Sequence, residues 1–231
     1  GNVISKTNPE AEELLRLDLP YTSLPKALGE WVIEKRESIV VSGTHGKTTT
    51  TSLLAWVAES LGVQPGFLIG GIPKNFSQSF RNPKGNYFII EGDEYDTAYF
   101  DKVPKFMHYK PKHVILTSIE FDHADIYADL NAVKAALKKL LELIPADGTL
   151  LYNGKDANIL ELLSQVKVNR SISYGDAQSD NQCQMVKQSE EGTLFFVRHG
   201  SKALGEFFTT MTGHYNIMNA TSEMGRMEKA N

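Results

Sequence analysis

Short apolar runs alternate along the chain with longer segments whose apolar residues recur at helical spacing. The run at 39–41 is β-branched throughout, and the segment at 48–61 carries leucines and Trp56 on a helical period. The first pattern is typical of a buried strand and the second of a helix packed on a sheet. Further strands are expected at 65–69, 87–91, 113–118 and 149–152, and further helices at 130–143 and 156–165. This alternation predicts an α/β fold, a mostly parallel sheet with helices on both faces.

The two ends of the chain carry different patterns. Asn8-Pro9 predicts a helix start, because asparagine caps helices well and proline suits their first turn, and Ser23 predicts a second start. Four short segments, at 171–174, 182–186, 193–198 and 203–209, predict a small antiparallel element appended to the sheet. A last helix is expected from Asn216, but few apolar residues follow Thr221. Either the chain stops partway through a larger protein or its last residues fray.

A glycine-rich loop connects the first strand to the helix that follows it. Residues 42–48 are Ser-Gly-Thr-His-Gly-Lys-Thr. Gly43 and Gly46 let backbone amides turn inward, and those amides together with the helix N-terminus form an anion-binding concavity. Lys47 can place its charge on outer phosphates, and the Thr48 hydroxyl can ligate Mg²⁺. An ordinary strand-to-helix turn with a chance Gly-Lys-Thr is the alternative.

Acidic residues follow two other predicted strands. Residues 91–96 are Glu-Gly-Asp-Glu-Tyr-Asp, and residues 120–125 are Glu-Phe-Asp-His-Ala-Asp, with the imidazole of His123 among the carboxylates. Ligands of open α/β sheets bind outside the carboxyl ends of the strands, where crowded carboxylates favour a cation. A solvated acidic loop and a structural histidine are the alternatives. We expect the glycine loop and both acidic runs to converge on one nucleotide–Mg²⁺ site.

Composition narrows the class of protein. The chain has 231 residues, 41% of them hydrophobic and 23% charged, with a formal net charge of −4, which disfavours a basic nucleic-acid binder. Cys183 is the single cysteine, which fits a reducing compartment. No apolar run approaches the ~20 residues needed to cross a bilayer, and the N-terminus shows no signal-peptide pattern. We therefore expect a cytoplasmic protein without membrane insertion.

Four motifs, in order, resemble those of the Mur ligase family of ATP-dependent ligases. They are Gly-Thr-His-Gly-Lys-Thr-Thr-Thr at 43–50, the acidic runs at 91–96 and 120–125, and Gly-His-Tyr-Asn-Ile-Met-Asn-Ala at 213–220. The resemblance implies that residues 1–36 are the tail of an N-terminal UDP-substrate domain with its linker. Residues 37–231 would be the central ATP-binding domain, and the family's C-terminal domain would be absent.

The resemblance also implies roles for particular residues. ATP and Mg²⁺ would be the cofactors, with Lys47 and His123 as catalytic residues and Thr48, Glu91 and His123 as metal ligands. The nucleotide would be held by Gly43, Thr44, His45, Gly46, Lys47, Thr48, Thr49, Asn216 and Asn219. Asn216 and Asn219 would contact the adenine, and Tyr215 stands where the family usually has histidine.

The activity implied by the resemblance is ATP-dependent amide formation. The lactyl carboxylate of UDP-N-acetylmuramate would become an acyl phosphate, which the amine of a recycled murein tripeptide, L-alanyl-γ-D-glutamyl-meso-diaminopimelate, would attack. L-alanine as the acceptor is one alternative. A nucleotide-binding module without turnover is the other, because the fragment lacks the family's C-terminal domain. The sequence leaves the oligomeric state open.

Overall fold

The computed structural model describes residues 4–122, 127–175 and 177–227, with side chains described as far as Thr221. Its strands are β1 (Glu37–Ser42), β2 (Gly66–Leu68), β3 (Phe80–Arg81), β4 (Tyr87–Gly92), β5 (Asp96–Ala98), β6 (Asp101–Pro104), β7 (His113–Leu116), β8 (Thr149–Asn153), β9 (Ser171–Gly175), β10 (Asn181–Ser189), β11 (Gly192–His199) and β12 (Lys202–Thr209). Its helices are α1 (Pro9–Arg16), α2 (Leu24–Leu28), the π-helical turn η1 (Gly29–Ile33), α3 (Lys47–Ser60), the 3₁₀ turn η2 (Lys105–His108), α4 (Leu130–Glu142), α5 (Ala157–Leu163) and α6 (His214–Met227).

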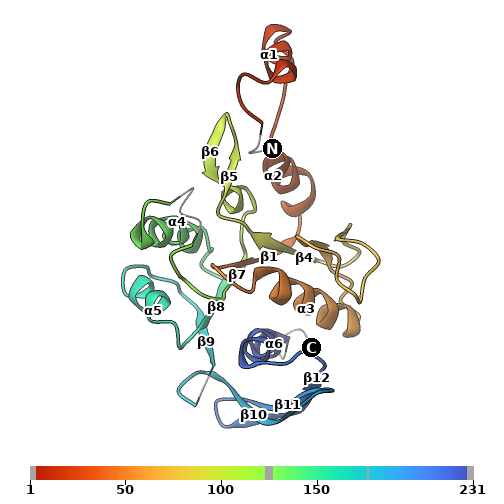
Figure 1. Ribbon diagram of the computed structural model, residues 1–231, viewed down its shortest axis with the longest axis vertical. Coiled ribbons are helices and arrows are strands. Elements are labelled where there is room, and N and C mark those ends of the chain that lie inside the picture. Colours follow the sequence, from red (N-terminus) through yellow and green to blue (C-terminus); the bar gives the residue numbers. More distant parts are fainter. Residues whose placement is uncertain (1–3, 123–126, 176, 228–231) are drawn as a thin grey trace.

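One ten-stranded sheet organises the fold, in the order β12-β11-β10-β9-β8-β7-β1-β4-β2-β3 (Figure 1). The pairs from β10 through β9, β8, β7, β1 and β4 to β2 are all parallel, while β3, β11 and β12 are antiparallel to their neighbours. β1 lies between β4 and β7, with Val41 opposite both Glu91 and Ile115. The predicted mostly parallel sheet is confirmed.

Helices cover both faces of the sheet, as the sequence predicts. Side chains alternate along β1, so that Val40 joins a core under α4 and α5, whereas Ile39 and Val41 join a second core under α3. The first core includes Leu137 of α4 and the second includes Leu54 of α3. The helices expected at 48–61, 130–143 and 156–165 are observed with their ends shifted by at most two residues.

The N-terminal helices begin where their caps predict. The Asn8 side chain accepts hydrogen bonds from the backbone N–H groups of Glu10 and Ala11, and Ser23 accepts one from Lys26. In Figure 1, α1 lies at the far end of the molecule from the β10–β12 strands. No helix in the described ranges is both long enough and apolar enough to cross a membrane. The domain boundary at residue 36 stays a prediction.

The antiparallel element near the C-terminus is smaller than predicted. We expected the segment at 171–174 to belong to it, but β9 pairs in parallel with β8, with Ser171 opposite Leu150. Tyr174 is buried in the core under α3, so this strand belongs to the main sheet. β10 is parallel to β9 and antiparallel to β11, and the antiparallel ribbon starts there. Local alternation identified a strand but carries no information about its partner.

Candidate functional site

The glycine loop joins β1 to α3 in a shape that requires glycine. Gly43 and Gly46 have φ angles of +128° and +83°, a region that side chains with a Cβ rarely adopt. A Cβ on Gly43 would lie 2.4 Å from the Thr117 Oγ1 and 2.9 Å from the Ser118 backbone nitrogen. Gly46 is the N-cap of α3, and this cap makes no side-chain hydrogen bond to the helix. The N-terminus of α3 is therefore suited to bind an anion.

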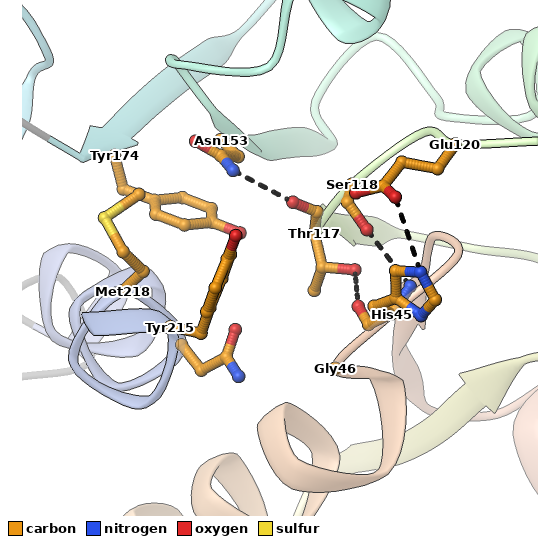
Figure 2. Close-up of a pocket in the computed structure, with 10 residues that line it drawn as sticks. His45, Gly46, Thr117, Ser118, Glu120, Asn153, Tyr174, Tyr215 and Met218 are labelled. Atoms are coloured by element: carbon orange, nitrogen blue, oxygen red, sulfur yellow. Dashed lines mark hydrogen bonds and ion pairs between the residues drawn. The ribbon is translucent and has the colours of Figure 1, made fainter. Parts of the chain in front are cut away.

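The end of β7 supports the loop from the side. The Thr44 backbone N–H donates to the Ser118 carbonyl oxygen (2.9 Å), and the His45 N–H donates to the Ser118 hydroxyl (3.0 Å). The Thr117 hydroxyl donates to the His45 carbonyl oxygen at 2.6 Å. His45, Thr117 and Ser118 are drawn in Figure 2. Thr117 and Ser118 were not predicted as site residues, although their position at the end of a predicted strand was a usable signal.

Thr44 connects the loop to the second acidic run. Its hydroxyl donates to the Glu120 carbonyl oxygen (3.1 Å) and accepts from the Glu120 backbone N–H (2.8 Å). The exposed imidazole of His45 lies 3.6 Å from the Glu120 carboxylate. Glu120, the first residue of the second acidic run, therefore meets the loop, as predicted. His123, expected to be a catalytic residue and metal ligand, lies outside the described residues.

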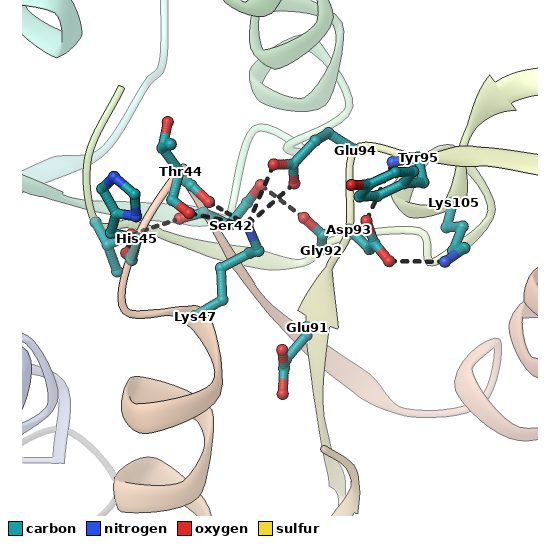
Figure 3. Close-up of polar contacts among 12 residues, drawn as sticks. Ser42, Thr44, His45, Lys47, Glu91, Gly92, Asp93, Glu94, Tyr95 and Lys105 are labelled. Carbon is teal, nitrogen blue, oxygen red and sulfur yellow. Dashed lines mark hydrogen bonds and ion pairs between the residues drawn. The ribbon is translucent and has the colours of Figure 1, made fainter. Parts of the chain in front are cut away.

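Lys47 points its ammonium back over the loop (Figure 3). The Nζ donates to the carbonyl oxygens of Gly43 (2.6 Å) and Thr44 (3.3 Å). It also lies 3.2 Å from the carboxylate of Glu94, and the two side chains are only 16% and 7% exposed. Glu94 is a site residue that the sequence analysis did not single out within its acidic run.

Thr48 and Glu91 meet, as the predicted metal site requires. The Thr48 hydroxyl donates to Glu91 Oε2 at 2.9 Å, and the Gly70 backbone N–H donates to Glu91 Oε1 at 2.6 Å. A hydroxyl and a carboxylate are the oxygen ligands that Mg²⁺ prefers. The described residues contain no group of three histidine, cysteine or acidic side chains placed to hold a metal ion. Two of the three predicted protein ligands are thus brought together, and the third lies outside the described residues.

The rest of the first acidic run is ion-paired. Asp93 lies 2.7 Å from the Nζ of Lys105, and Asp96 lies 2.9 Å from the Nζ of Lys102. Burial and the nearby acidic side chains, Glu94 first among them, raise the pKa of Tyr127, which keeps its phenol neutral. The carboxylates of Asp93 and Asp96 are therefore held by ion pairs outside the loop rather than solvated.

A cavity of about 390 Å³ opens beside the loop. Its lining comes from the loop, the ends of β7, β8 and β9, and α6: His45, Gly46, Thr117, Ser118, Glu120, Asn153, Tyr174, Tyr215, Met218 and Asn219. Figure 2 shows Tyr174, Tyr215 and Met218 on one side of it and Thr117, Ser118 and His45 on the other. Aromatic and amide groups around a cleft next to an anion site suit a nucleobase.

The two asparagines expected to contact adenine are placed differently. Asn219 lines the cavity, and its amide lies about 3.2 Å from the position that a Cβ on Gly46 would take. The Asn216 amide instead donates to the Thr212 carbonyl oxygen at 2.8 Å and does not line the cavity. Tyr215, which is 85% exposed, stands at the rim. Of the remaining predicted nucleotide contacts, Thr49 follows in the first turn of α3.

Comparison with known proteins agrees with this geometry. A family model described as the Mur ligase middle domain matches residues 41–225. A UDP-N-acetylmuramate–L-alanyl-γ-D-glutamyl-meso-2,6-diaminoheptandioate ligase from Haemophilus influenzae is 40% identical over 220 residues, which are 95% of this chain and 48% of the relative. The enzyme of that name from Escherichia coli is 35% identical over 219 residues, 95% of this chain and 47% of the relative.

Solved structures give the same assignment. The crystal structure of UDP-N-acetylmuramate:L-alanyl-γ-D-glutamyl-meso-diaminopimelate ligase from Neisseria meningitides matches with a TM-score of 0.89 and 36% identity, over 100% of this chain and 73% of that one. The chain spans about half the length of the curated relatives it matches. The family model, the relatives and the shared sheet together show that the chain belongs to the Mur ligase family, of which it contains the middle domain.

Proposed function

We propose that the chain is the ATP-binding part of a ligase that joins UDP-N-acetylmuramate to the tripeptide L-alanyl-γ-D-glutamyl-meso-diaminopimelate. Relatives at 40% and 35% identity carry the name of that activity. The observation that carries the proposal is the meeting of three strand ends at one place: the loop after β1, Glu91 of β4, and Thr117 and Ser118 after β7. ATP and Mg²⁺ are the proposed cofactors, and the cytoplasm is the proposed location.

The residues present fit a nucleoside triphosphate with its metal ion. Gly46 and the first turn of α3 offer backbone N–H groups to a phosphate. The cavity of about 390 Å³ beside them is large enough for a nucleoside. Glu91 and Thr48 supply oxygen ligands beside the loop. When bound, ATP supplies the phosphoryl group that activates the lactyl carboxylate of UDP-N-acetylmuramate.

The chain's own groups would act by position and charge. Lys47 would neutralise charge on the transferred phosphoryl group, the N–H groups at the N-terminus of α3 would hold the phosphate chain in line, and Asn219 would fix the base. The carboxylate gains the phosphoryl group and ADP is released. The peptide amine then attacks the activated carbonyl, the amide forms and phosphate leaves. The substrates are small molecules, with no nucleic acid involved.

A coupled phosphate-release assay tests the proposed function and its acceptor. The chain is incubated with ATP, Mg²⁺ and UDP-N-acetylmuramate, and either the tripeptide or L-alanine is added. Phosphate release that depends on the tripeptide is the expected result for a full-length ligase that contains this chain, whereas the chain alone is expected to be inactive. Release that depends on L-alanine instead would reassign the acceptor, an alternative supported by a relative at 32% identity that is named UDP-N-acetylmuramate–L-alanine ligase.

Nucleotide binding without turnover is the second candidate function. The observation behind it is that the chain spans about half the length of its curated relatives. Calorimetry with ADP distinguishes this case, because a binding module gives a saturable heat without any phosphate release. Binding of neither ADP nor ATP–Mg²⁺ would contradict both candidates.

A further inference from the structure

The ammonium of Lys47 is already fully engaged by its own chain. A lysine ammonium has three N–H donors. The Gly43 carbonyl, the Thr44 carbonyl and the Glu94 carboxylate supply three acceptors within 3.3 Å of it. A phosphate can receive a hydrogen bond from this nitrogen only after one of these contacts is given up.

Glu94 is held firmly in this position. Both of its carboxylate oxygens lie 3.2 Å from the Lys47 Nζ, and its backbone carbonyl accepts a hydrogen bond from the Tyr127 hydroxyl at 3.0 Å. Its side chain is 7% exposed, so water screens the pair only weakly and the attraction is stronger than at the surface. The pair is therefore a built feature of the site rather than a surface contact.

The neighbouring carboxylates of the same run have different partners. Asp93 pairs with Lys105, and Asp96 pairs with Lys102. Glu91 turns away from the lysine toward Thr48 and Gly70 (Figure 3). Each acidic side chain of the run thus has its own partner, and Glu94 is the one that faces the lysine of the phosphate loop.

We propose that Glu94 is a positioning residue that stores Lys47 as an ion pair and competes with nucleotide phosphates for its ammonium. The inference rests on the proposed function, because it presumes that this loop binds a nucleotide. When phosphates bind in the loop, the Lys47 ammonium leaves the Glu94 carboxylate and contacts the phosphates. When the product dissociates, the ion pair with Glu94 forms again. Glu94 thereby weakens nucleotide binding and speeds the release of ADP.

The substitution Glu94→Gln removes the charge and keeps the shape of the side chain. We expect the variant of this chain to bind ADP and ATP–Mg²⁺ about tenfold more tightly than the wild type in isothermal titration calorimetry, a change that corresponds to about 1.4 kcal/mol. In stopped-flow measurements the dissociation rate constant of ADP should fall by about the same factor, since affinity changes of this kind act mainly on dissociation. A purely structural role for Glu94 predicts the opposite sign, namely weaker binding.

Asp93→Asn is the matched control, because it removes one negative charge at the position next to Glu94. The carboxylate of Asp93 pairs with Lys105 and not with Lys47. Its ADP affinity should stay within about twofold of the wild type. Equal tightening in both variants would show a general charge effect and overturn the assignment to Glu94. Unchanged or weaker ADP binding in a folded Glu94→Gln variant would overturn it as well.

A second measurement needs no variant at Glu94. In nucleotide-free wild-type chain, the Lys47 ammonium protons should give a slowly exchanging NMR signal, assigned by its loss in Lys47→Arg, and ADP should shift it. Exchange as fast as that of an exposed lysine would refute the stored ion pair while leaving nucleotide binding intact. Absence of ADP binding in wild type and variant alike would overturn the proposed function and the stored pair together.

Discussion

Replacing Gly46 by alanine separates the role of the loop in nucleotide binding from its role in stability. Gly46 has a φ of +83° and sits at the N-terminus of α3. An alanine in this left-handed conformation costs about 1–2 kcal/mol. The new Cβ would also lie 3.2 Å from the Asn219 amide nitrogen and 3.3 Å from its oxygen, so this amide must shift by a few tenths of an ångström. The substitution therefore disturbs both the phosphate cradle and the adjacent cavity.

Gly62 provides a matched control at the other end of the same helix. Its φ is +76°, and no atom lies within 4 Å of the position that its Cβ would take. Gly62→Ala thus carries the same backbone cost without touching a neighbour. At the ~2–4 °C per kcal/mol expected for a chain of this size, both variants should melt about 2–8 °C below the wild type in differential scanning fluorimetry without nucleotide.

Nucleotide affinity should distinguish the two variants. We expect Gly46→Ala to bind ADP at least about tenfold more weakly than Gly62→Ala in calorimetry, a difference of about 1.4 kcal/mol. The reason is that the methyl group would lie against the Asn219 amide where Gly46 lines the cavity, next to the N-terminus of α3 at which a phosphate is proposed to bind. ADP affinities of the two variants within about twofold of each other would refute the assignment of the loop as the phosphate site.

Three further predictions concern single side chains. Lys47→Ala should abolish measurable ADP binding in calorimetry, and unchanged binding would remove the lysine from the site. Glu91→Gln and His123→Ala should each raise the Mg²⁺ concentration needed for half-maximal ATP binding, on the order of tenfold, because each removes a proposed metal ligand; an unaltered Mg²⁺ titration counts against that residue. Asn219→Ala should weaken ADP binding about tenfold and Asn216→Ala by less than about threefold, because only Asn219 lines the cavity. The reverse order in calorimetry would restore the assignment of Asn216 to the base.

The backbone of the site could be predicted from the sequence because it follows from local rules. A β-branched run, two glycines and a helical period suffice to place the loop between β1 and α3. Parallel strands end at the same edge of a sheet, so Glu91 was expected near the loop and meets Thr48 there. The family resemblance carried the identity of the ligand, which no spacing could supply.

The choice between neighbouring side chains could not be predicted in the same way. Glu91 and Glu94 lie three residues apart in one acidic run, yet Glu94 pairs with Lys47 whereas Glu91 accepts a hydrogen bond from Thr48. Likewise Asn216 and Asn219 lie on one helix, but only Asn219 lines the cavity. Such choices depend on the local course of the chain after a strand and on the phase of a helix against its neighbours. Both are fixed by tertiary packing and have no signature in the motif.

The strand order explains why the site forms at β1. From β1 the chain passes through α3 to β2 and returns to β4 on one side, whereas β7, reached next, lies on the other side of β1. The sheet grows in both directions from this strand, so right-handed crossovers place α3 on one face and α4 on the other. The connections that leave β1 and β7 therefore diverge and open a crevice at their carboxyl ends. Thr117, Ser118 and the loop are joined by hydrogen bonds and together form one side of the cavity at this edge. A Thr117→Val substitution removes the 2.6 Å hydrogen bond to the His45 carbonyl oxygen. It should accordingly weaken ADP binding in calorimetry while changing the melting temperature only slightly.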